Sequence, residues 1–409
     1  MEKKLVLDVH DKPRPLEWLA LSAQHVLAMF GATVLVPMLT GLPVSLALLS
    51  SGIGTLVYIL LTKAKAPIYL GSSFAFIAPI ITAAGIGGQG AVTGGLVMIG
   101  VVYCIIAVII KLIGSDWVHR LLPPIVVGPT VIVIGLSLAP TAVSMASGHV
   151  AVALITLLAA ILVSTYTKGL FKLLPVFSGI IVGYIASIFF GLVDFSHFGN
   201  VGLISQLDFS FLNAAPIFNL EIAGIMVPIA IVTIAEHIGD VMLLSDILGR
   251  DLTKIPGLHR TLAGDGIATA LAGFIGGPAN TTYGENIGVV GLTKVASVWV
   301  MGGAAVIAIL LGFVGPFNAI IQTIPTPVMG GVSILLFGII ASCGARVMIN
   351  HKVDLSQERN LIIASVILVV GIGDLAIDLG PLNFSGMALA AIIGILLNLL
   401  LPKHSKKME

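Results

Sequence analysis

Long apolar runs follow one another along almost the whole chain, and only short polar intervals separate them. A helix that spans a lipid bilayer needs about 20 mostly apolar residues, and most of these runs are close to that length. The pattern therefore predicts an all-α membrane protein with fourteen membrane-spanning segments. We place the segments at residues 16–38, 43–62, 67–83, 90–112, 122–140, 150–167, 173–193, 221–248, 261–276, 282–297, 299–319, 325–343, 360–373 and 384–401.

The composition supports the same class. Of the 409 residues, 57% are hydrophobic and 10% are charged, and the mean hydropathy is +1.12. This balance excludes a soluble globular protein. Residues 1–15 are rich in charge and lack the apolar core of a signal peptide, so the first span is expected to act as its own insertion signal. We predict a multi-pass protein of the cell membrane, meaning an inner or plasma membrane.

Net charge, cysteines and motifs narrow the partners further. A net charge of +1 argues against nucleic acid as a partner. Cys104 and Cys343 lie in separate apolar runs, where we expect buried small residues and not a disulfide or a metal pair. The sequence contains no Walker-type phosphate loop, no zinc-ligand spacing and no Ser-His-Asp order, so we predict no enzyme, no cofactor and no metal site.

The basic residues segregate to one side of the predicted membrane. All 20 Lys and Arg residues fall on one face when the spans are threaded in order. The opposite loops, near residues 39–42, 84–89, 141–149, 194–220, 277–281, 320–324 and 374–383, contain none. Because cytoplasmic loops carry the excess of Lys and Arg, both termini are predicted to be cytoplasmic.

Two halves of the sequence contain matching features. The spacing Pro-x3-Gly-x6-Gly occurs at residues 124–135 and again at 327–338, each time at the start of a predicted span. The Gln-His pair at 24–25 in the first span matches the Glu-His pair at 236–237 in the eighth. Seven predicted spans separate the copies, so the two halves would have opposite orientations. This indicates an inverted repeat, which is common in transporters.

The third and tenth predicted spans are short and interrupted. Each starts with a few extended residues after a proline, Pro67 or Pro278, and is expected to become helical only around Ser73 or Glu285. Paired broken segments at corresponding places in two halves point to a substrate site near the middle of the membrane.

Five ionisable residues stand out within the predicted spans: His25, Glu236, His237, Asp240 and Glu285. An ionisable side chain at the bilayer centre costs at least about 2.5 to 3.5 kcal/mol, so it usually faces a cavity. Glu236 and Asp240 are four apart and share one helix face. Two carboxylates this close and away from water should not both ionise at neutral pH, so we expect one to hold a proton.

That proton would be taken up with substrate on one side and released on the other. For His25 and His237 a structural alternative stays open, in which the imidazole donates to a neighbouring carbonyl or amide.

The same residues indicate what the site would bind. Gly284, beside Glu285 at the start of a half-helix, lets a flat ligand approach the backbone. Helix N-termini donate N–H bonds to oxygen, whereas the carboxylates of Glu236 and Glu285 accept from N–H groups. A planar ring with alternating N–H and C=O groups fits this set, with Phe74 and Tyr283 against its faces. Sulfate or bicarbonate would be repelled by the carboxylates, and a cation would leave the N–H groups unpaired.

Several stretches carry a resemblance to a known family. Residues 285–294 fit a signature of Gln, Glu or Pro, then Asn-x-Gly-x4-Thr and a basic residue or Gly. The chain resembles the nucleobase-ascorbate transporters, also called nucleobase-cation symporter 2, and within them the bacterial uracil permeases. The stretches that resemble uracil permeases are residues 24–37, 69–76, 235–239 and 282–286.

The resemblance implies two inverted repeats of seven spans that are divided into a core domain and a gate domain. The core would contain spans one to four and eight to eleven, and the gate the remaining six. We expect a cytoplasmic tail at 1–15, core at 16–114, gate at 115–215, core at 216–322, gate at 323–401 and a second cytoplasmic tail at 402–409.

The resemblance also implies the site residues. Substrate would lie between core and gate, in contact with Phe74, Glu236, Gly284 and Glu285, and with Ala32 and Tyr283 lining the pocket. We expect proton coupling to involve Glu236, Asp240, His25 and Asn286.

The function that the resemblance implies is secondary active import of uracil coupled to a cation, which we expect to be a proton. Transport would proceed by alternating access, in a homodimer packed through its gate domains. The alternatives are a purine or xanthine carrier of the same family, sodium-coupled uptake, an anion carrier of the same fold, and a receptor or enzyme that does not transport. Glu285 is typical of the uracil branch, whereas purine and xanthine carriers tend to have Gln there.

Two positions depart from the family pattern. Asp240 stands where uracil permeases often have a histidine linked to proton coupling, which puts the coupling route in doubt. Phe337 stands where some relatives have a pocket tyrosine, which removes a hydroxyl from the pocket wall.

Overall fold

The structure is a computed structural model that describes residues 5–168, 174–195, 202–204, 214–378, 383–384 and 386–402. The predicted C-terminal tail lies outside the described residues apart from Pro402. Four residues of the N-terminal tail and part of the predicted loop at 194–220 lie outside them as well.

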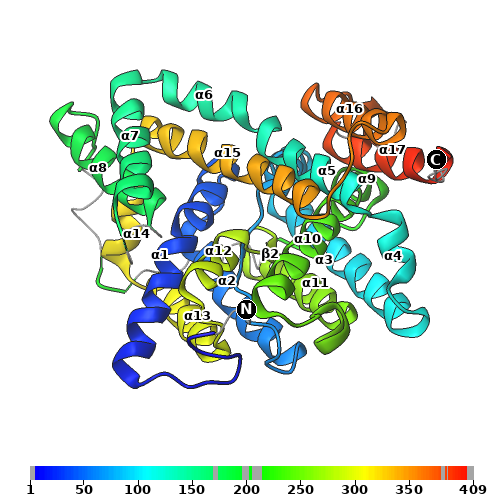
Figure 1. The fold of residues 1–409 in the computed structure, drawn as a ribbon. Coiled ribbons are helices and arrows are strands. Elements are labelled where there is room, and N and C mark those ends of the chain that lie inside the picture. The colour runs from blue at the N-terminus through cyan, green and yellow to red at the C-terminus, as the bar shows by residue number, and fades with distance from the viewer. Residues whose placement is uncertain are drawn as a thin grey trace.

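The first half of the chain is helical apart from one short strand (Figure 1). Its elements are α1 (Pro15–Thr40), α2 (Val44–Leu61), β1 (Leu70–Ser72), the 3-10 turn η1 (Phe74–Phe76), α3 (Ile77–Ile113), α4 (Asp116–Leu121), α5 (Pro124–Ser137), α6 (Ala139–Ser147), α7 (Val150–Tyr166) and α8 (Pro175–Phe189).

The second half has the same character. Its elements are α9 (Leu220–Met226), α10 (Ile229–Leu248), the π-helical turn η5 (Thr253–Gly257), α11 (Leu258–Ile275), β2 (Asn280–Thr282), α12 (Gly284–Thr293), α13 (Val298–Gly312), α14 (Gly315–Gln322), α15 (Thr326–Asn350), α16 (Glu358–Ile372), β3 (Ile377–Asp378), β4 (Asn383–Phe384) and α17 (Gly386–Leu400).

Each predicted span overlaps at least one helix. The fourth span lies within α3 and the third ends in the first turns of the same helix, which is interrupted at Gly87 and Gly88 by non-helical backbone. Gly88 has φ 58° and ψ −150°, a region that only glycine enters readily. Within the described residues, six helical segments are long and apolar enough to cross a membrane: 15–40, 44–61, 74–113, 124–147, 220–248 and 326–350. Four further apolar helices are shorter: α7, α8, α13 and α17.

The helices pack in two groups. In the first, α11 lies along α3 and α2, and α13 lies along α2 and α1. In the second, α15 contacts α5, α6, α7 and α8, while α16 packs on α5 and α17. The first group occupies the lower part of Figure 1 and the second the upper part. Helix α10 contacts α12 on one side and α5 and α17 on the other, so it lies between the groups.

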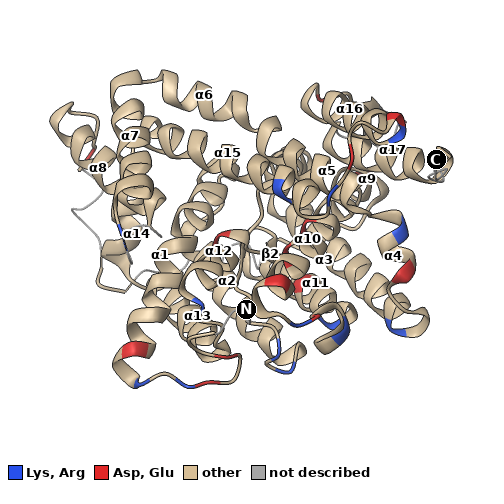
Figure 2. Cartoon of the chain, viewed as in Figure 1, with Lys and Arg blue, Asp and Glu red and all other residues tan. Residues whose placement is uncertain are grey.

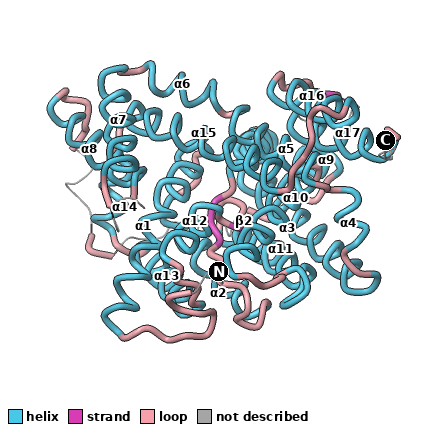
Figure 3. Tube along the Cα trace, in the orientation of Figure 1, coloured by secondary structure: helices cyan, strands magenta, loops and turns pink. Residues whose placement is uncertain are grey.

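Two short strands pair at the centre of the first group. Strands β1 and β2 are antiparallel, with Leu70 opposite Thr282 and Ser72 opposite Asn280. In Figure 3 the β2 segment appears as a magenta piece of chain surrounded by helices. The pairing extends at both ends, because Ser73 N–H donates to Ala279 O and Tyr283 N–H donates to Tyr69 O. The extended lead-ins predicted for the third and tenth spans are therefore present and bonded to each other.

Side chains from neighbouring helices complete the bonding of these strands. On the α2 side, the hydroxyls of Ser51 and Thr55 donate to Leu70 O, and Thr55 accepts from Leu70 N–H. On the α11 side, Thr269 donates to the carbonyl of Asn280 at 2.6 Å. A bilayer offers no water to bond such groups, so an extended segment at membrane depth needs partners from the protein.

The described part of the predicted N-terminal tail is not a free tail. It runs beside residues 294–298, where Val6 N–H donates to Lys294 O and Ala296 N–H donates to Leu7 O. Arg250 donates to Asp8, and this bond lowers the pKa of the Asp8 carboxyl. The segment thereby joins the end of α12 to the turn after α10.

Charged residues are unevenly distributed over the fold. In Figure 2, Lys and Arg lie mainly along the lower and right margins of the view, and α6 and α8 in the upper left carry none.

We expect Gly71→Ala to destabilise the protein. A Cβ at position 71 would overlap the ring of Tyr283, and that ring cannot withdraw because its hydroxyl bonds to Ser72 O and Thr33. Overpacking of this kind costs about 1–3 kcal/mol, so the unfolding temperature of the purified protein in detergent should fall. Gly302→Ala in α13 is the matched control, since its Cβ would meet only Ile59, at 3.9 Å. An equal unfolding temperature for the two variants would contradict the packing argument.

Candidate functional site

A cavity of about 230 Å³ lies between the two helix groups. One wall comes from the strands, η1, α10 and α12, and the other from α5 and α15. The lining residues are Ser72, Ser73, Phe74, Val131, Glu236, Gly239, Asp240, Leu243, Asp246, Thr281, Thr282, Tyr283, Gly284, Glu285, Gly288, Ile339, Ile340, Cys343, Arg346, Val347, Asn350 and His351. The structure therefore gathers residues from five distant stretches of the chain around one hollow.

Two helix N-termini meet at this cavity. Strand β1 ends at Ser72 and leads into η1 at Phe74, and strand β2 ends at Thr282 and leads into α12 at Gly284. Because the strands are antiparallel, the two helices begin at opposite ends of the strand pair, and the first residues of both, Phe74 and Gly284, line the cavity. The first N–H groups of a helix have no partner within the helix, so these N-termini offer donors to a ligand.

The acidic side chains predicted for the site line this cavity together. Glu236 and Asp240 extend from the same face of α10, and Glu285 is the second residue of α12. Asp240 lies over the start of α12, since a Cβ on Gly284 would be 3.5 Å from Asp240 Oδ1. The cavity thus presents three carboxyl groups beside two groups of backbone donors.

Aromatic rings close part of the cavity. The Phe74 ring packs edge-on against Phe337 of α15, with centroids 5.4 Å apart. Phe337 itself is buried behind Phe74 and is not among the lining residues. The Tyr283 hydroxyl donates to Ser72 O at 2.9 Å and also bonds to Thr33, so it is already occupied within the protein. Phe74 therefore offers an apolar face to a ligand, whereas the hydroxyl of Tyr283 links β1 to α1 by hydrogen bonds.

Three buried polar atoms at the cavity wall lack a hydrogen-bond partner among the described residues: Glu236 Oε2, Ser72 Oγ and Ser73 Oγ. Both serines are almost fully buried, at 0% and 3% exposure. Leaving such atoms unbonded costs about 1–3 kcal/mol each, which favours a ligand or water at this position. The two serines were not singled out from sequence, because an apolar stretch with a serine pair carries no signal for an unpaired hydroxyl.

Three predicted residues lie behind the cavity wall and do not line it. Asn286 Nδ2 lies 3.1 Å from His25 Nδ1 and donates to His25 O at the same distance. This contact ties α12 to α1. Ala32 is buried on α1, next to Thr33, and is not among the lining residues.

The second histidine belongs to a buried polar network that sequence reasoning missed. His237 Nδ1 lies 2.9 Å from Asp265 Oδ2, and His237 Nε2 lies 2.9 Å from Thr261. Asp265 also accepts from the backbone N–H and the hydroxyl of Thr282 at the end of β2. His237 thus has an acidic partner and not the carbonyl or amide of the structural alternative. The signal for Asp265 was an acidic residue inside a predicted span, between Gly264 and Gly266.

One end of the cavity has a polar rim that the sequence did not reveal. Asp246, Arg346, Asn350 and His351 all line it and are exposed. Arg346 was assigned to a loop after a span ending at residue 343, but α15 continues to Asn350. The longer helix places Arg346 on the cavity wall.

Both cysteines are free. The sequence predicted both to be buried, but both are partly exposed. Cys343 lines the cavity, and Cys104 lies on the outer surface of α3. Within the residues that the structure describes, no group of three or more His, Cys, Asp and Glu side chains is arranged to hold a metal ion.

The arrangement can recognise a small polar ring without covalent chemistry. The carboxyl groups accept from N–H donors, the helix N-termini and serine hydroxyls donate to carbonyl oxygens, and Phe74 covers an apolar face. A proton on one carboxyl would change both the charge and the hydrogen-bonding pattern of the cavity.

The sequence matches a protein family and several characterised relatives. The model of a family described as the Permease family matches residues 16–379. The chain is 53% identical to a uracil permease of Bacillus caldolyticus, over 99% of this chain and 97% of the relative. It is 49% identical to a uracil permease of Bacillus subtilis, over 99% and 97%, and 42% identical to a uracil permease of Escherichia coli K12, over 96% and 93%.

The fold matches solved membrane transporters of low sequence identity. The transmembrane domain of the cyanobacterial bicarbonate transporter BicA aligns with a TM-score of 0.67 at 14% identity, over 95% of this chain and 99% of that chain. The structure of SLC26A9 aligns with a TM-score of 0.69 at 10% identity, over 94% and 64%. These likenesses establish a helical transporter fold.

Asp265→Ala should lower the stability of the protein. The substitution leaves the buried N–H and hydroxyl of Thr282 without their acceptor and removes the partner of His237, which costs about 1–3 kcal/mol or more. Thermal unfolding in detergent measures the effect. Asp116→Ala, at the exposed start of α4, is the control and should cost only a few tenths of a kcal/mol. If Asp265→Ala unfolds no earlier than this control, the network does not support β2.

Proposed function

This chain belongs to the Permease family, and from that premise we propose that it is a multi-pass membrane transporter that imports uracil. The observation that carries the proposal is the cavity in which Glu236, Glu285, Phe74 and two helix N-termini face one another. The uracil permeases that resemble this chain over nearly its full length support the same substrate.

Uracil complements the cavity group by group. It is a planar ring with N–H donors and C=O acceptors in alternation. The carboxyl groups of Glu236 and Glu285 accept from its N–H groups. The backbone N–H groups at Phe74 and Gly284, and the unpaired hydroxyls of Ser72 and Ser73, are placed to donate to its carbonyl oxygens. The Phe74 ring covers one face.

The acidic wall argues against an anion as the substrate. The fold neighbour BicA is a bicarbonate transporter, but the cavity of this chain holds Glu236, Asp240 and Glu285. A negatively charged ligand would be repelled by any of these groups in its ionised form, and the repulsion is strong away from water. A neutral ring with N–H groups is the better fit.

We further propose that the fold has fourteen crossings in two inverted repeats, with a core and a gate domain that move against each other. The antiparallel pairing of β1 and β2 supports an inverted relation of the halves. The position of the cavity, between the two helix groups, supports alternating access by relative movement of those groups. Both termini would be cytoplasmic, and two copies would pack through their gate domains in the cell membrane.

Coupling to a proton is proposed to centre on Asp240, which occupies the position where relatives often have histidine. Asp240 lies over Gly284 and beside Glu285, so ionising it adds a negative charge where the substrate approaches. A proton taken up by its carboxylate removes that charge and favours substrate entry. Loss of the proton on the other side restores the charge and favours release. Sodium is the alternative coupling ion.

We expect Glu285→Gln to reduce uracil uptake about 10- to 100-fold. Gln replaces a carboxylate acceptor by an amide that also donates, and a hydrogen bond to a charged group contributes about 1.5–3 kcal/mol. Uptake of labelled uracil into proteoliposomes measures this loss. Glu358→Gln, at the exposed start of α16, makes the same chemical change outside the cavity and should transport normally.

The same assay tests the substrate class. Unlabelled uracil should compete fully with labelled uracil, whereas xanthine and uric acid should compete weakly. Unchanged uptake by Glu285→Gln would refute the role of this side chain. Stronger competition by xanthine than by uracil would identify a purine carrier instead.

Asp240→Asn should separate binding from coupling. The amide cannot take up and release a proton in the physiological pH range, so accumulation of uracil against its gradient, driven by an imposed pH gradient, should be lost. Exchange of labelled for unlabelled uracil should persist, because exchange needs no net proton movement. Asp116→Asn, on the surface of α4, is the matched control. Undiminished accumulation in Asp240→Asn would exclude this coupling route.

A further inference from the structure

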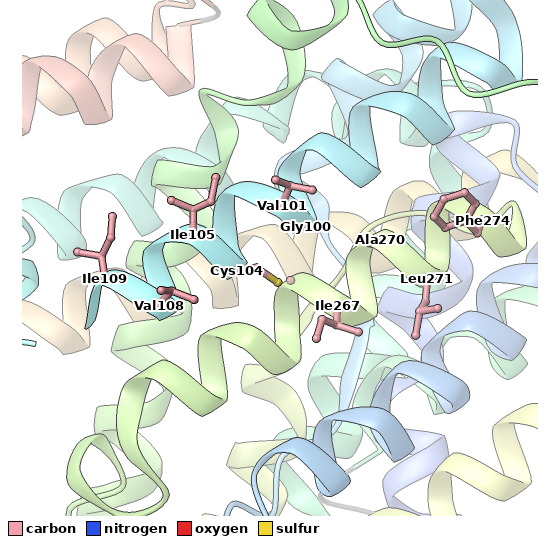
Figure 4. A pocket seen from close by; sticks show the side chains of 11 residues that line it. Gly100, Val101, Cys104, Ile105, Val108, Ile109, Ile267, Ala270, Leu271 and Phe274 are labelled. Atoms are coloured by element: carbon pink, nitrogen blue, oxygen red, sulfur yellow. The ribbon is translucent and has the colours of Figure 1, made fainter. Parts of the chain in front are cut away.

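A second hollow lies on the outer surface of the molecule, away from the substrate cavity. It is a groove of about 470 Å³ between α3 and α11, which Figure 4 shows from close by. Every residue that lines it is apolar or small: Gly100, Val101, Cys104, Ile105, Val108, Ile109, Gly266, Ile267, Ala270, Leu271 and Phe274. The groove shares no lining residue with the substrate cavity.

The groove exists because the two helices cross closely at small residues. A Cβ on Gly100 would lie 2.6 Å from Gly266 O and 2.7 Å from the Cβ of Ala270. Larger side chains on either side form the walls of the groove. In Figure 4, Ile105 and Val108 extend from α3, and Ile267 and Leu271 extend from α11. The result is a narrow apolar channel along the membrane-spanning surface.

Positive charges lie beyond one end of this channel. Helices α3 and α11 are antiparallel, so α3 ends at Ile113 near the place where α11 begins at Leu258. Lys111 is in the last turn of α3, and His259 and Arg260 are in the first turn of α11. The pKa of His259 is lowered, first by burial and then by the positive charges of Arg260 and Lys111. Burial and these two charges favour the neutral imidazole, so the cations at this end of the channel are Lys111 and Arg260.

Among the described residues, neither Lys111 nor Arg260 forms an ion pair with a carboxylate. The ion pairs found there join His237 to Asp265, Arg250 to Asp8 and Lys254 to Asp251, and none includes Lys111 or Arg260. Arg260 donates only to the carbonyl of Leu61, at 3.4 Å. A cluster of cations at the mouth of an apolar channel is a site that an anion with a hydrocarbon tail would complete.

We propose that this groove binds one anionic phospholipid. Its phosphate would lie against Lys111 and Arg260, and one acyl chain would occupy the channel between α3 and α11. Basic pockets at the ends of membrane helices recognise anionic headgroups, and the apolar channel matches the chain that such a headgroup carries. A zwitterionic lipid fills the channel equally well but brings its own positive charge to the cluster, so it binds less tightly.

Photocrosslinking in proteoliposomes tests the site independently of uracil transport. The probes are phosphatidylglycerol and phosphatidylcholine that carry the same photoactivatable acyl chain, each used with the full-length protein. Phosphatidylglycerol adducts should concentrate in the peptides that contain residues 101–109 and 267–274. Phosphatidylcholine adducts should be several-fold fewer there and should spread over other surface helices.

Lys111→Gln should reduce the phosphatidylglycerol adducts in these peptides about fivefold, because one lysine near anionic lipid contributes about 1 kcal/mol. Lys168→Gln is the control, since it removes an exposed lysine just after α7, far from the groove in sequence and outside its lining. Ile105→Trp narrows the channel without changing charge and should reduce the adducts as well. Size-exclusion profiles check that each variant is folded.

Three outcomes would overturn the proposal. Equal labelling by the two lipids would show that the headgroup is not recognised. Unchanged labelling in both Lys111→Gln and Ile105→Trp would place the adducts outside this site. Displacement of phosphatidylglycerol by oleate at equal concentration would identify a fatty acid, and not a phospholipid, as the occupant.

Discussion

The fold depends on one constraint, which is that every backbone polar group at membrane depth must find a partner inside the protein. Helices meet this constraint within themselves, but β1 and β2 do not. The two strands bond to each other, and the helices on either side supply what remains: hydroxyls from α2 on one edge, and a hydroxyl and the Asp265 carboxylate from α11 on the other. Helices α2 and α11 therefore pack around the strands both to supply hydrogen-bond partners and to make apolar contacts.

The candidate site follows from this arrangement. A helix that begins in the middle of the protein leaves its first N–H groups unbonded, and such a beginning is possible only after an extended segment. Two of these beginnings, at Phe74 and Gly284, follow the two ends of the antiparallel strand pair, and both line the same cavity. Helix α10 then adds Glu236 and Asp240 opposite the donors. The proposed recognition of a ring that offers both donors and acceptors rests on finding both kinds of group in one hollow.

The sequence predicted the general features of this site but not its supporting network. Acidic residues within apolar runs and prolines before short spans are strong signals, and they led to Glu236, Asp240, Glu285 and the two lead-ins. Asp265 carries the same signal, but its bonds to Thr282 and His237 depend on neighbours in space that the sequence does not show. The orphaned hydroxyls of Ser72 and Ser73 have no sequence signal at all, because whether a buried serine is bonded depends on its neighbours in space. Arg346 falls in a loop if the span ends at residue 343, but the helix continues to Asn350. A sequence pattern locates a helix better than it locates the end of that helix.

The pairing of β1 with β2 also sets an order for biogenesis. Strand β1 is synthesised about 210 residues before its partner, and α11, which completes the bonding, emerges only shortly before β2. Until then the nascent third span has unpaired backbone groups that lipid cannot accept. The first half of the chain therefore cannot settle in the translocon as a finished unit. It must wait, sheltered by insertion machinery or held near the interface, until the ribosome has delivered most of the second half.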